Sequence, residues 1–147
     1  MTIIISKSSP SDLLEAKNLL NLVDLTTQGI DDQFNNFFLV KERNKIIGLG
    51  GLETHEKKGL LRSLAVLPEY RNNNIGKKLL YCLLGFASDL GLDEIFLLTE
   101  TAENYFKKFN FTAIDRKDTP REIKDTIEFS EACPKSATVM KLGLRKK

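Results

Sequence analysis

Short apolar runs alternate along the chain with longer amphipathic stretches, a pattern typical of a mixed α/β domain. Apolar and β-branched runs predict seven strands, at residues 2–5, 37–41, 45–54, 60–67, 94–98, 112–115 and 137–142. Helical spacing predicts a helix starting near Asp12, a second from residue 75 to about Gly91, a third within 99–111 and a short turn after Pro120. We therefore expect an α/β fold (α+β in some schemes), with a twisted mixed sheet of about six to seven strands and helices on both faces.

The most abrupt change of pattern lies between residues 60 and 80. Leu60–Leu67 is an apolar run followed by Pro68, which cannot donate a hydrogen bond to a sheet. From Ile75 onward, apolar residues recur at helical spacing. The segment 68–74 is therefore expected to connect a buried strand to a helix.

This connector has the composition of a phosphate-binding loop. Asn72–Asn74 and Gly76 are residue types that adopt left-handed backbone conformations at low cost, so successive N–H groups can point at one spot. At a helix N-terminus such a spot suits an anion, and Arg71 and Lys77 add positive charge at its rim. A strand-to-helix loop that is merely rich in turn residues explains the same composition.

Composition limits the class of protein but does not indicate a ligand. A length of 147 residues, 41% hydrophobic and 29% charged, fits one soluble globular domain over residues 1–147. The net charge of +2 comes from interspersed charges, which predicts no nucleic-acid partner. No apolar segment approaches the roughly 18 to 20 residues of a membrane span, and no signal-peptide pattern is present, so we expect a cytoplasmic protein. Two separated cysteines and the single histidine, His55, predict no metal site.

The segment around the connector resembles motif A of the GNAT family, the acetyl-CoA-dependent N-acetyltransferases. That motif is a strand, then V-x-P-x-Y-R, then R/Q-x-x-G-x-G/A at the start of a helix. Asn74 stands where the family usually has glycine, and asparagine is a low-cost substitute in that backbone region. The matching residues are Val66, Pro68, Tyr70, Arg71, Ile75, Gly76 and Leu79.

A second segment, residues 99–111, resembles the family's motif B. The match rests on Ala102, Tyr105, Phe106, Lys108 and Phe111. Many members carry, at the position of Phe106, a tyrosine that protonates the departing CoA thiolate. Tyr105 is the substitute, but it is turned about 100° around the helix from Phe106, so we expect it to face elsewhere.

The resemblance implies acetyl-CoA as the cofactor, with its pantetheine arm between the fourth and fifth strands. The residues implied to bind it are Leu64, Ala65, Val66, Arg71, Asn72, Asn73, Asn74, Ile75, Gly76, Lys77, Thr99 and Phe106. The family often takes its general base from the fourth strand, where this chain has Leu60 and Leu61. Glu53 and His55, two apart on the preceding strand, are the nearest alternatives, Glu53 through a water chain.

The last third of the chain contains a third set of matching positions, Thr99, Thr101, Pro120, Cys133, Pro134, Ser136 and Val139. Through them it resembles small GNAT proteins of arsenic-resistance operons and, more loosely, short N-acetylglutamate synthases. That likeness implies a small amino acid or analogue as acceptor, in a protein that could form a homodimer. Arg62 and Ser63, or Arg121, could bind its carboxylate, although Arg62 at an exposed sheet edge and Arg121 at a helix start fit the sequence equally. The remaining acceptor candidates are Cys133, which could be purely structural, and Ser136.

Two other functions stay open at this point. The missing tyrosine and the missing strand carboxylate favour a catalytically weak CoA-binding module. An open acceptor groove would instead suit a protein or peptide N-acetyltransferase. The N-acetylation of a small amine is the function that the two motifs and the last third indicate together.

Overall fold

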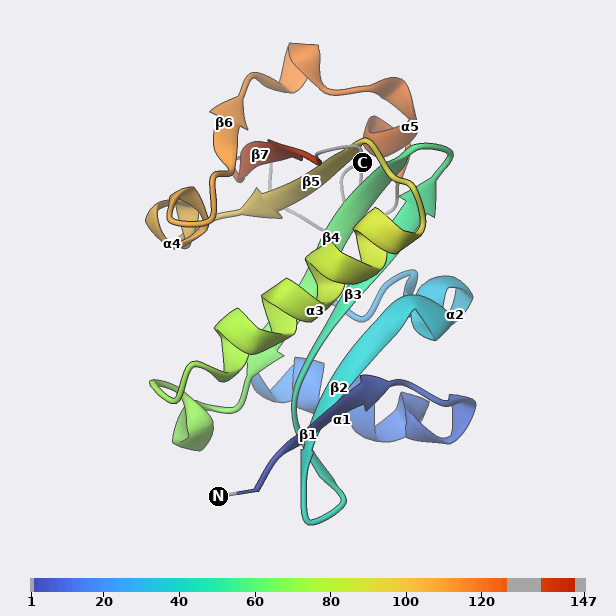
Figure 1. The fold of residues 1–147 in the computed structure, drawn as a ribbon, viewed down its shortest axis with the longest axis vertical. Coiled ribbons are helices and arrows are strands. Elements are labelled where there is room, and N and C mark those ends of the chain that lie inside the picture. Colours follow the sequence, from blue (N-terminus) through green and yellow to red (C-terminus); the bar gives the residue numbers. More distant parts are fainter. Residues whose placement is uncertain (1, 127–135, 145–147) are drawn as a thin grey trace.

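A computed structural model describes residues 2–126 and 136–144, which form one sheet flanked by helices (Figure 1). In the described part of the chain, seven strands are ordered β1-β2-β3-β4-β5-β7-β6. Their bounds are β1 Ile4–Lys7, β2 Phe37–Glu42, β3 Lys45–His55, β4 Lys58–Val66, β5 Glu94–Thr99, β6 Thr112–Ile114 and β7 Thr138–Gly143. Only β4 and β5 pair in parallel, and the other neighbours pair antiparallel. The predicted mixed sheet is confirmed.

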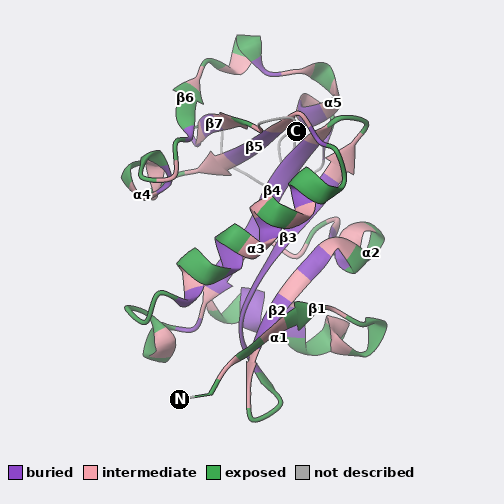
Figure 2. Ribbon diagram, in the orientation of Figure 1, coloured by how far each residue is buried: buried purple, intermediate pink, exposed green. Residues whose placement is uncertain are grey.

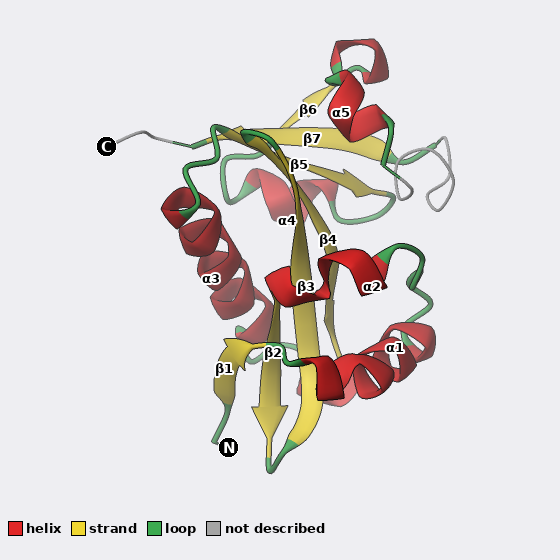
Figure 3. Cartoon of the chain, turned by 90° about the vertical axis from the view of Figure 1, so that its right-hand side faces the viewer, coloured by secondary structure: helices red, strands yellow, loops and turns green. Residues whose placement is uncertain are grey.

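Helices cover both faces of this sheet, as predicted. Figure 3 shows α3 on one side of β2, β3 and β4, and α1 and α2 on the other. The helices are α1 Leu13–Leu22, α2 Ile30–Gln33, α3 Ile75–Asp89, α4 Glu103–Lys107 and α5 Arg121–Lys124. Shorter 3-10 turns occupy Pro10–Asp12, Phe34–Asn36, Pro68–Tyr70 and Arg116–Asp118. The helix predicted within 99–111 is reduced to α4, and Asn110 follows it in a left-handed conformation with φ 72°.

The core lies on both faces of the middle strands, between them and α3 on one face and between them and α1 and α2 on the other. Figure 2 shows the buried residues concentrated in β3, β4 and the side of α3 that faces them. A Cβ at Gly51 would overlap the fully buried ring of Phe37, and one at Gly50 would lie 2.8 Å from Leu83 of α3. The glycines of β3 therefore make room for neighbouring side chains.

The parallel pair of β4 and β5 is short, and this opens the sheet. Pairing covers only Lys58 with Glu94, Gly59 with Ile95 and Leu60 with Phe96. Beyond Leu60, β4 stays with β3 and β5 stays with β7, so the two strands diverge. Ser63, with φ +60°, lies where the β3–β4 register shifts, and this bulge bends β4 further. The resulting gap points at the N-terminus of α3.

Candidate active site

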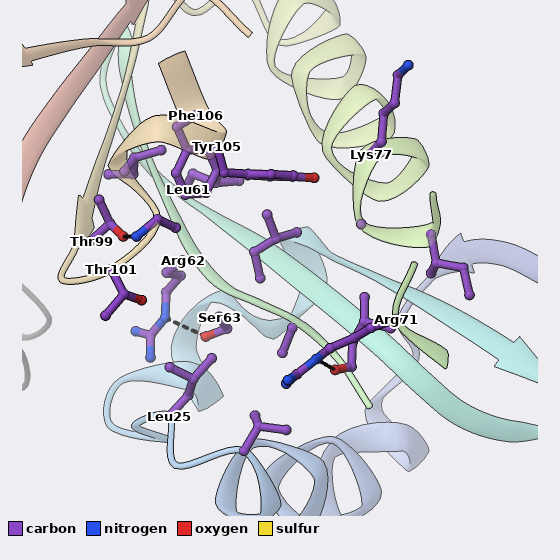
Figure 4. A pocket seen from close by; sticks show the side chains of 18 of the residues that line it. Leu25, Leu61, Arg62, Ser63, Arg71, Lys77, Thr99, Thr101, Tyr105 and Phe106 are labelled. Atoms are coloured by element: carbon purple, nitrogen blue, oxygen red, sulfur yellow. Dashed lines mark hydrogen bonds between the residues drawn. The ribbon is translucent and has the colours of Figure 1, made fainter. Parts of the chain in front are cut away.

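The gap between β4 and β5 opens into a pocket of about 870 Å³ (Figure 4). One wall is β4 from Leu61 to Val66, and the opposite wall is the end of β5 with α4. The connector before α3 closes one end, and the loop of residues 23–26 lies at the other. The pocket thus joins two segments that the sequence analysis selected for different reasons, the asparagine-rich connector and Arg62–Ser63.

The connector has the backbone expected of an anion-binding loop. Asn72 and Asn74 adopt left-handed conformations with φ 68° and 60°, and Asn74 caps α3. Within the described residues, no group accepts a hydrogen bond from the main-chain N–H groups of residues 72–77. These donors stand at the positive end of a 15-residue helix, beside the pocket.

Side chains of the connector hold its shape. The Nε of Arg71 donates to the carbonyl of Val66 at 3.0 Å, which ties the connector to the end of β4. Nδ2 of Asn73 donates to the carbonyls of Tyr70 at 3.1 Å and of Arg71 at 3.3 Å. Asn73 does not line the pocket, whereas the other eleven residues that the sequence analysis assigned to the cofactor do. Lys77 extends from the start of α3 away from the pocket floor (Figure 4).

Tyr105 and Phe106 differ in direction, and the expectation that Tyr105 faces elsewhere is wrong. The ring of Phe106 is buried against Phe111, at a centroid distance of 5.7 Å. Because that ring turns into the core, its neighbour Tyr105 crosses the pocket toward α3 (Figure 4). A Cβ built on Gly76 would lie 3.4 Å from the Tyr105 hydroxyl. The turn into α4 is held by Thr99, whose Oγ1 accepts from the Ala102 N–H at 2.9 Å.

The environment of Tyr105 keeps its phenol protonated. Burial raises the pKa of Tyr105 above its ordinary value of 10.0, and the nearby Tyr81 raises it further. A phenol with a raised pKa is neutral at physiological pH and can donate a proton into the pocket. Tyr105 is thus a titratable donor at the connector end of the pocket, and its role as the acid stays a prediction.

At the other end of the pocket, Arg62 is buried and hydrogen-bonded, so the interpretation of an exposed edge residue is wrong. Its side chain is 0% exposed. Nη1 donates to Oε2 of Glu53 at 2.9 Å, Nη2 to the carbonyl of Gln28 at 2.7 Å and Nε to Oγ of Ser63 at 3.1 Å. Arg62 and Ser63 both line the pocket.

Glu53 and His55 lie behind Arg62. They are on the same face of β3, as predicted, with 3.4 Å between Nε2 of His55 and Oε1 of Glu53. Neither is among the described residues that line the pocket. A proton leaving an acceptor amine would therefore reach Glu53 or His55 only through water or through intervening groups.

The remaining acceptor candidates are less central. Arg121 is exposed at the start of α5, and Ser136 is exposed beside Ala137, which does line the pocket. Neither Arg121 nor Ser136 is a described lining residue. Cys133 falls outside the described residues.

The sequence analysis missed an aromatic edge of the pocket. Tyr81 of α3 and Phe109 after α4 both line the pocket, with ring centroids 5.8 Å apart. Tyr81 is 55% exposed because it lies on the solvent-facing side of the amphipathic helix α3. An aromatic residue on the polar face of that helix is the signal that could have revealed it.

Fold and site together define a class of protein. A parallel strand pair that diverges toward unpartnered amides at a helix N-terminus is an arrangement suited to a phosphate-bearing ligand. The sequence profile of the acetyltransferase (GNAT) family matches residues 8–111. The chain therefore belongs to the GNAT family.

Known relatives agree with this assignment. An uncharacterized N-acetyltransferase of Chlorobaculum tepidum is 29% identical over 99 residues, which cover 67% of this chain and 63% of that protein. The amino-acid acetyltransferase of Enterobacter sp. is 26% identical over 110 residues, which cover 74% of this chain and 25% of that protein. This chain thus matches under two thirds of the length of either relative.

Solved structures share the fold. N-acetylglutamate synthase from Neisseria gonorrhoeae, complexed with coenzyme A and N-acetyl-glutamate, superposes with a TM-score of 0.85 at 15% identity, over 99% of this chain and 36% of that chain. Rv2747 from Mycobacterium tuberculosis, whose structure contains CoA, gives a TM-score of 0.81 at 22% identity, over 97% and 99%. These likenesses confirm the GNAT fold over nearly the whole chain.

None of the helices in the described part of the chain is long and apolar enough to cross a membrane. Within residues 2–126 and 136–144, no group of three or more His, Cys, Asp or Glu side chains could hold a metal ion.

Proposed function

We propose that this protein is an N-acetyltransferase that moves the acetyl group of acetyl-CoA to the amine of a small molecule, an amino acid or an analogue of one. One observation carries the proposal: a single pocket connects the unpartnered amides of residues 72–77 with the buried guanidinium of Arg62. The amides suit a diphosphate and the guanidinium suits a carboxylate, so the two ends match the two substrates.

The chain's residues fit coenzyme A along the whole pocket. The diphosphate would accept hydrogen bonds from the amides of the connector, where Asn72 and Asn74 hold the required backbone. The pantetheine arm would lie along β4 beyond Leu60, where β5 no longer pairs with it. The main-chain groups of Leu64–Val66 on that edge could bond the pantetheine amides as a strand would.

Acetyl-CoA supplies the acetyl group as a thioester: the amine nitrogen forms the new C–N bond, the C–S bond breaks, and CoA leaves as a thiolate. Tyr105 is the proposed donor of the proton to that sulfur. Its phenol is neutral and its hydroxyl lies beside Gly76 at the connector end, so the proton would reach the sulfur through water. A free thiol has a pKa of about 8.5, so the leaving group needs only modest help. Glu53 and His55 stay predictions as the receiver of the amine proton.

Arg62 and Ser63 are the proposed contacts for the acceptor's carboxylate. Both line the pocket at the end opposite the connector. An amino-acid acceptor is supported by the amino-acid acetyltransferases among the relatives and by the synthase structure that holds N-acetyl-glutamate. The charge-assisted hydrogen bonds of a guanidinium favour an acceptor that carries a carboxylate, phosphinate or similar anion beside its amine.

The test compares Gly76→Asp with Gly76→Asn, which have side chains of equal size and different charge. A carboxylate about 4 Å from a diphosphate costs about 4 kcal/mol at an effective dielectric constant near 20. By calorimetry, we therefore expect Gly76→Asp to bind acetyl-CoA at least about a hundredfold more weakly than Gly76→Asn. High salt should narrow this difference. Folded wild-type protein that fails to bind acetyl-CoA would contradict the proposal.

The acceptor is tested by turnover. Release of free CoA thiol would be followed with a panel of amino acids and their phosphinate and arsenical analogues. We expect turnover with at least one α-amino acid or analogue and none with the corresponding amine that lacks the acidic group. Binding of acetyl-CoA without turnover of any member would instead identify a CoA-binding module.

A further inference from the structure

The acceptor end of the pocket is bordered by the segment between α1 and α2, of which residues 24–29 are here named the acceptor loop. Val23–Thr26 line the pocket, and Asp24 adopts a left-handed conformation with φ 60°. Main-chain bonds hold the start of the loop to the end of α1, from Leu25 N–H to the Leu20 carbonyl at 2.9 Å. The later part of the loop runs into the buried start of α2 at Ile30 and has a further anchor on the sheet.

Arg62 provides that anchor. Its Nη2 donates to the carbonyl of Gln28 at 2.7 Å. Across the described ranges, this is the only hydrogen bond that joins residues 24–29 to the sheet. The same guanidinium bonds Ser63 on its own strand, so the position of the acceptor loop depends on how the Arg62 side chain is held.

Glu53 holds it. Arg62 is opposite Gly51 in the β3–β4 register and Glu53 is two residues further along β3, so both side chains project from the same face of the sheet. Glu53 is 7% exposed, its Oε2 accepts from Arg62, and its Oε1 faces His55. A buried carboxylate bonded to a fully buried guanidinium restricts the rotamers of both side chains.

We propose that Glu53 is a positioning residue for acetyl transfer: it orients Arg62, and through Arg62 it holds the acceptor loop in place. The proposal rests on the proposed function for its kinetic consequence, because Arg62 and the loop bound the acceptor end of the pocket. It assigns Glu53 a role different from that of general base, for which it would need access to the acceptor amine.

Hydrogen exchange tests the structural part without any substrate. Glu53→Gln keeps an oxygen that can accept from Arg62 but removes the charge, so the anchor weakens while the packing is kept. We expect main-chain amides of residues 24–29 to exchange about tenfold faster than in the wild type. Glu56→Gln, the same change at an exposed position of the same hairpin, should leave that exchange unchanged. Unchanged exchange in Glu53→Gln would overturn the proposal.

Kinetics separate a positioning residue from a base. As a positioning residue, Glu53→Gln should raise the acceptor KM about tenfold, change kcat only a few-fold, and leave the affinity for acetyl-CoA and the shape of the pH–rate profile unchanged. If Glu53 were the general base, Glu53→Gln would instead lower kcat by about a hundredfold or more and remove the acidic limb of the pH–rate profile. That second outcome would overturn the proposal.

A second variant covers the case in which Glu53→Gln does not fold. Lysine carries one ammonium on a flexible stem and cannot bond Glu53, Ser63 and the Gln28 carbonyl at once. Arg62→Lys should therefore show the same faster exchange of residues 24–29, and slow exchange there would overturn the proposal. If the wild type binds acetyl-CoA but turns over no acceptor, the proposed function fails, while the exchange results still decide the role of Glu53.

Discussion

At the scale of single residues, the pocket depends on where two adjacent aromatic side chains point. Phe106 turns into the core against Phe111, and Tyr105 consequently crosses the pocket toward Gly76. Burial raises the pKa of Tyr105, so the phenol stays neutral over the whole physiological range. A neutral phenol can give a proton to a thiolate but cannot take one from an amine.

Replacing Tyr105 with phenylalanine should therefore slow the transfer without affecting cofactor binding. We expect kcat to fall by no more than about a hundredfold, at the low end for a general acid, because a thiolate is already a good leaving group. Calorimetry should show unchanged affinity for acetyl-CoA.

Tyr81→Phe, which removes a phenol from the exposed edge of the same pocket, is the control and should keep the wild-type kcat. A general acid must be protonated to act, and Tyr105 stays protonated up to pH 9 because its pKa is raised above 10.0. Titration of Tyr105 should therefore not lower the rate between about pH 7 and 9. Equal kcat values for Tyr105→Phe and the wild type would show that Tyr105 is not the acid.

At the scale of elements, β3 packs closely against its neighbours on both faces because it carries glycines where their side chains cross it. Phe37 of β2 occupies the space over Gly51, and Leu83 of α3 and Leu64 of β4 occupy the space over Gly50. Gly50 thereby lets α3 lie close to β3, beside the gap between β4 and β5. The glycine pattern therefore serves the site through packing rather than through contact with a ligand.

Replacing Gly51 with alanine and replacing Gly85 with alanine should change the free energy of unfolding in opposite directions. A Cβ at Gly51 would overlap the buried ring of Phe37, so Gly51→Ala should destabilise the fold by about 1 to 3 kcal/mol or more. Gly85 lies exposed within α3 with nothing within 4 Å of its Cβ position, so Gly85→Ala should stabilise the fold by about 0.5 to 1 kcal/mol. Urea unfolding of both variants checks the two signs, and a stable Gly51→Ala would contradict the packing described for β3.

At the scale of the whole molecule, the sheet is divided by the divergence of β4 and β5. Strands β1–β4 and strands β5, β7 and β6 are joined through only three paired positions, from Lys58 to Leu60. The pocket lies in this division and takes its walls from both parts. A ligand bound there contacts both parts of the sheet and should strengthen their association.

Acetyl-CoA should accordingly raise the melting temperature. At a free concentration of 100 times Kd, a ligand that binds only the folded state adds about 2.7 kcal/mol. For a domain of this size that corresponds to a rise of roughly 5 to 10 °C. Differential scanning calorimetry measures it, and Gly76→Asp should show a much smaller rise at the same ligand concentration. The rise in melting temperature with free pantetheine, which lacks the diphosphate, is the second comparison.

Several features of the fold could be predicted from local patterns. Apolar runs and turn residues located the seven strands within a few residues, because strand and helix periods depend on neighbouring side chains. The connector was also predictable, since asparagine and glycine have known backbone preferences and Asn72 and Asn74 do adopt the left-handed region. The cofactor end of the site is built largely from this one continuous segment, and for that reason a motif could reveal it.

The acceptor end was decided by tertiary structure. Whether Arg62 is exposed or buried depends on Gln28, 34 residues before it, and on Glu53 of the neighbouring strand. Whether Tyr105 faces the pocket or solvent depends on how the ring of Phe106 packs against Phe111. Residue type and helical spacing cannot determine the directions of these side chains, because the directions depend on how rings and charged groups pack in the folded core. The sequence by itself therefore determined the strands, the helices and the phosphate-binding connector, whereas the packing of distant segments decided which side chains face the acceptor.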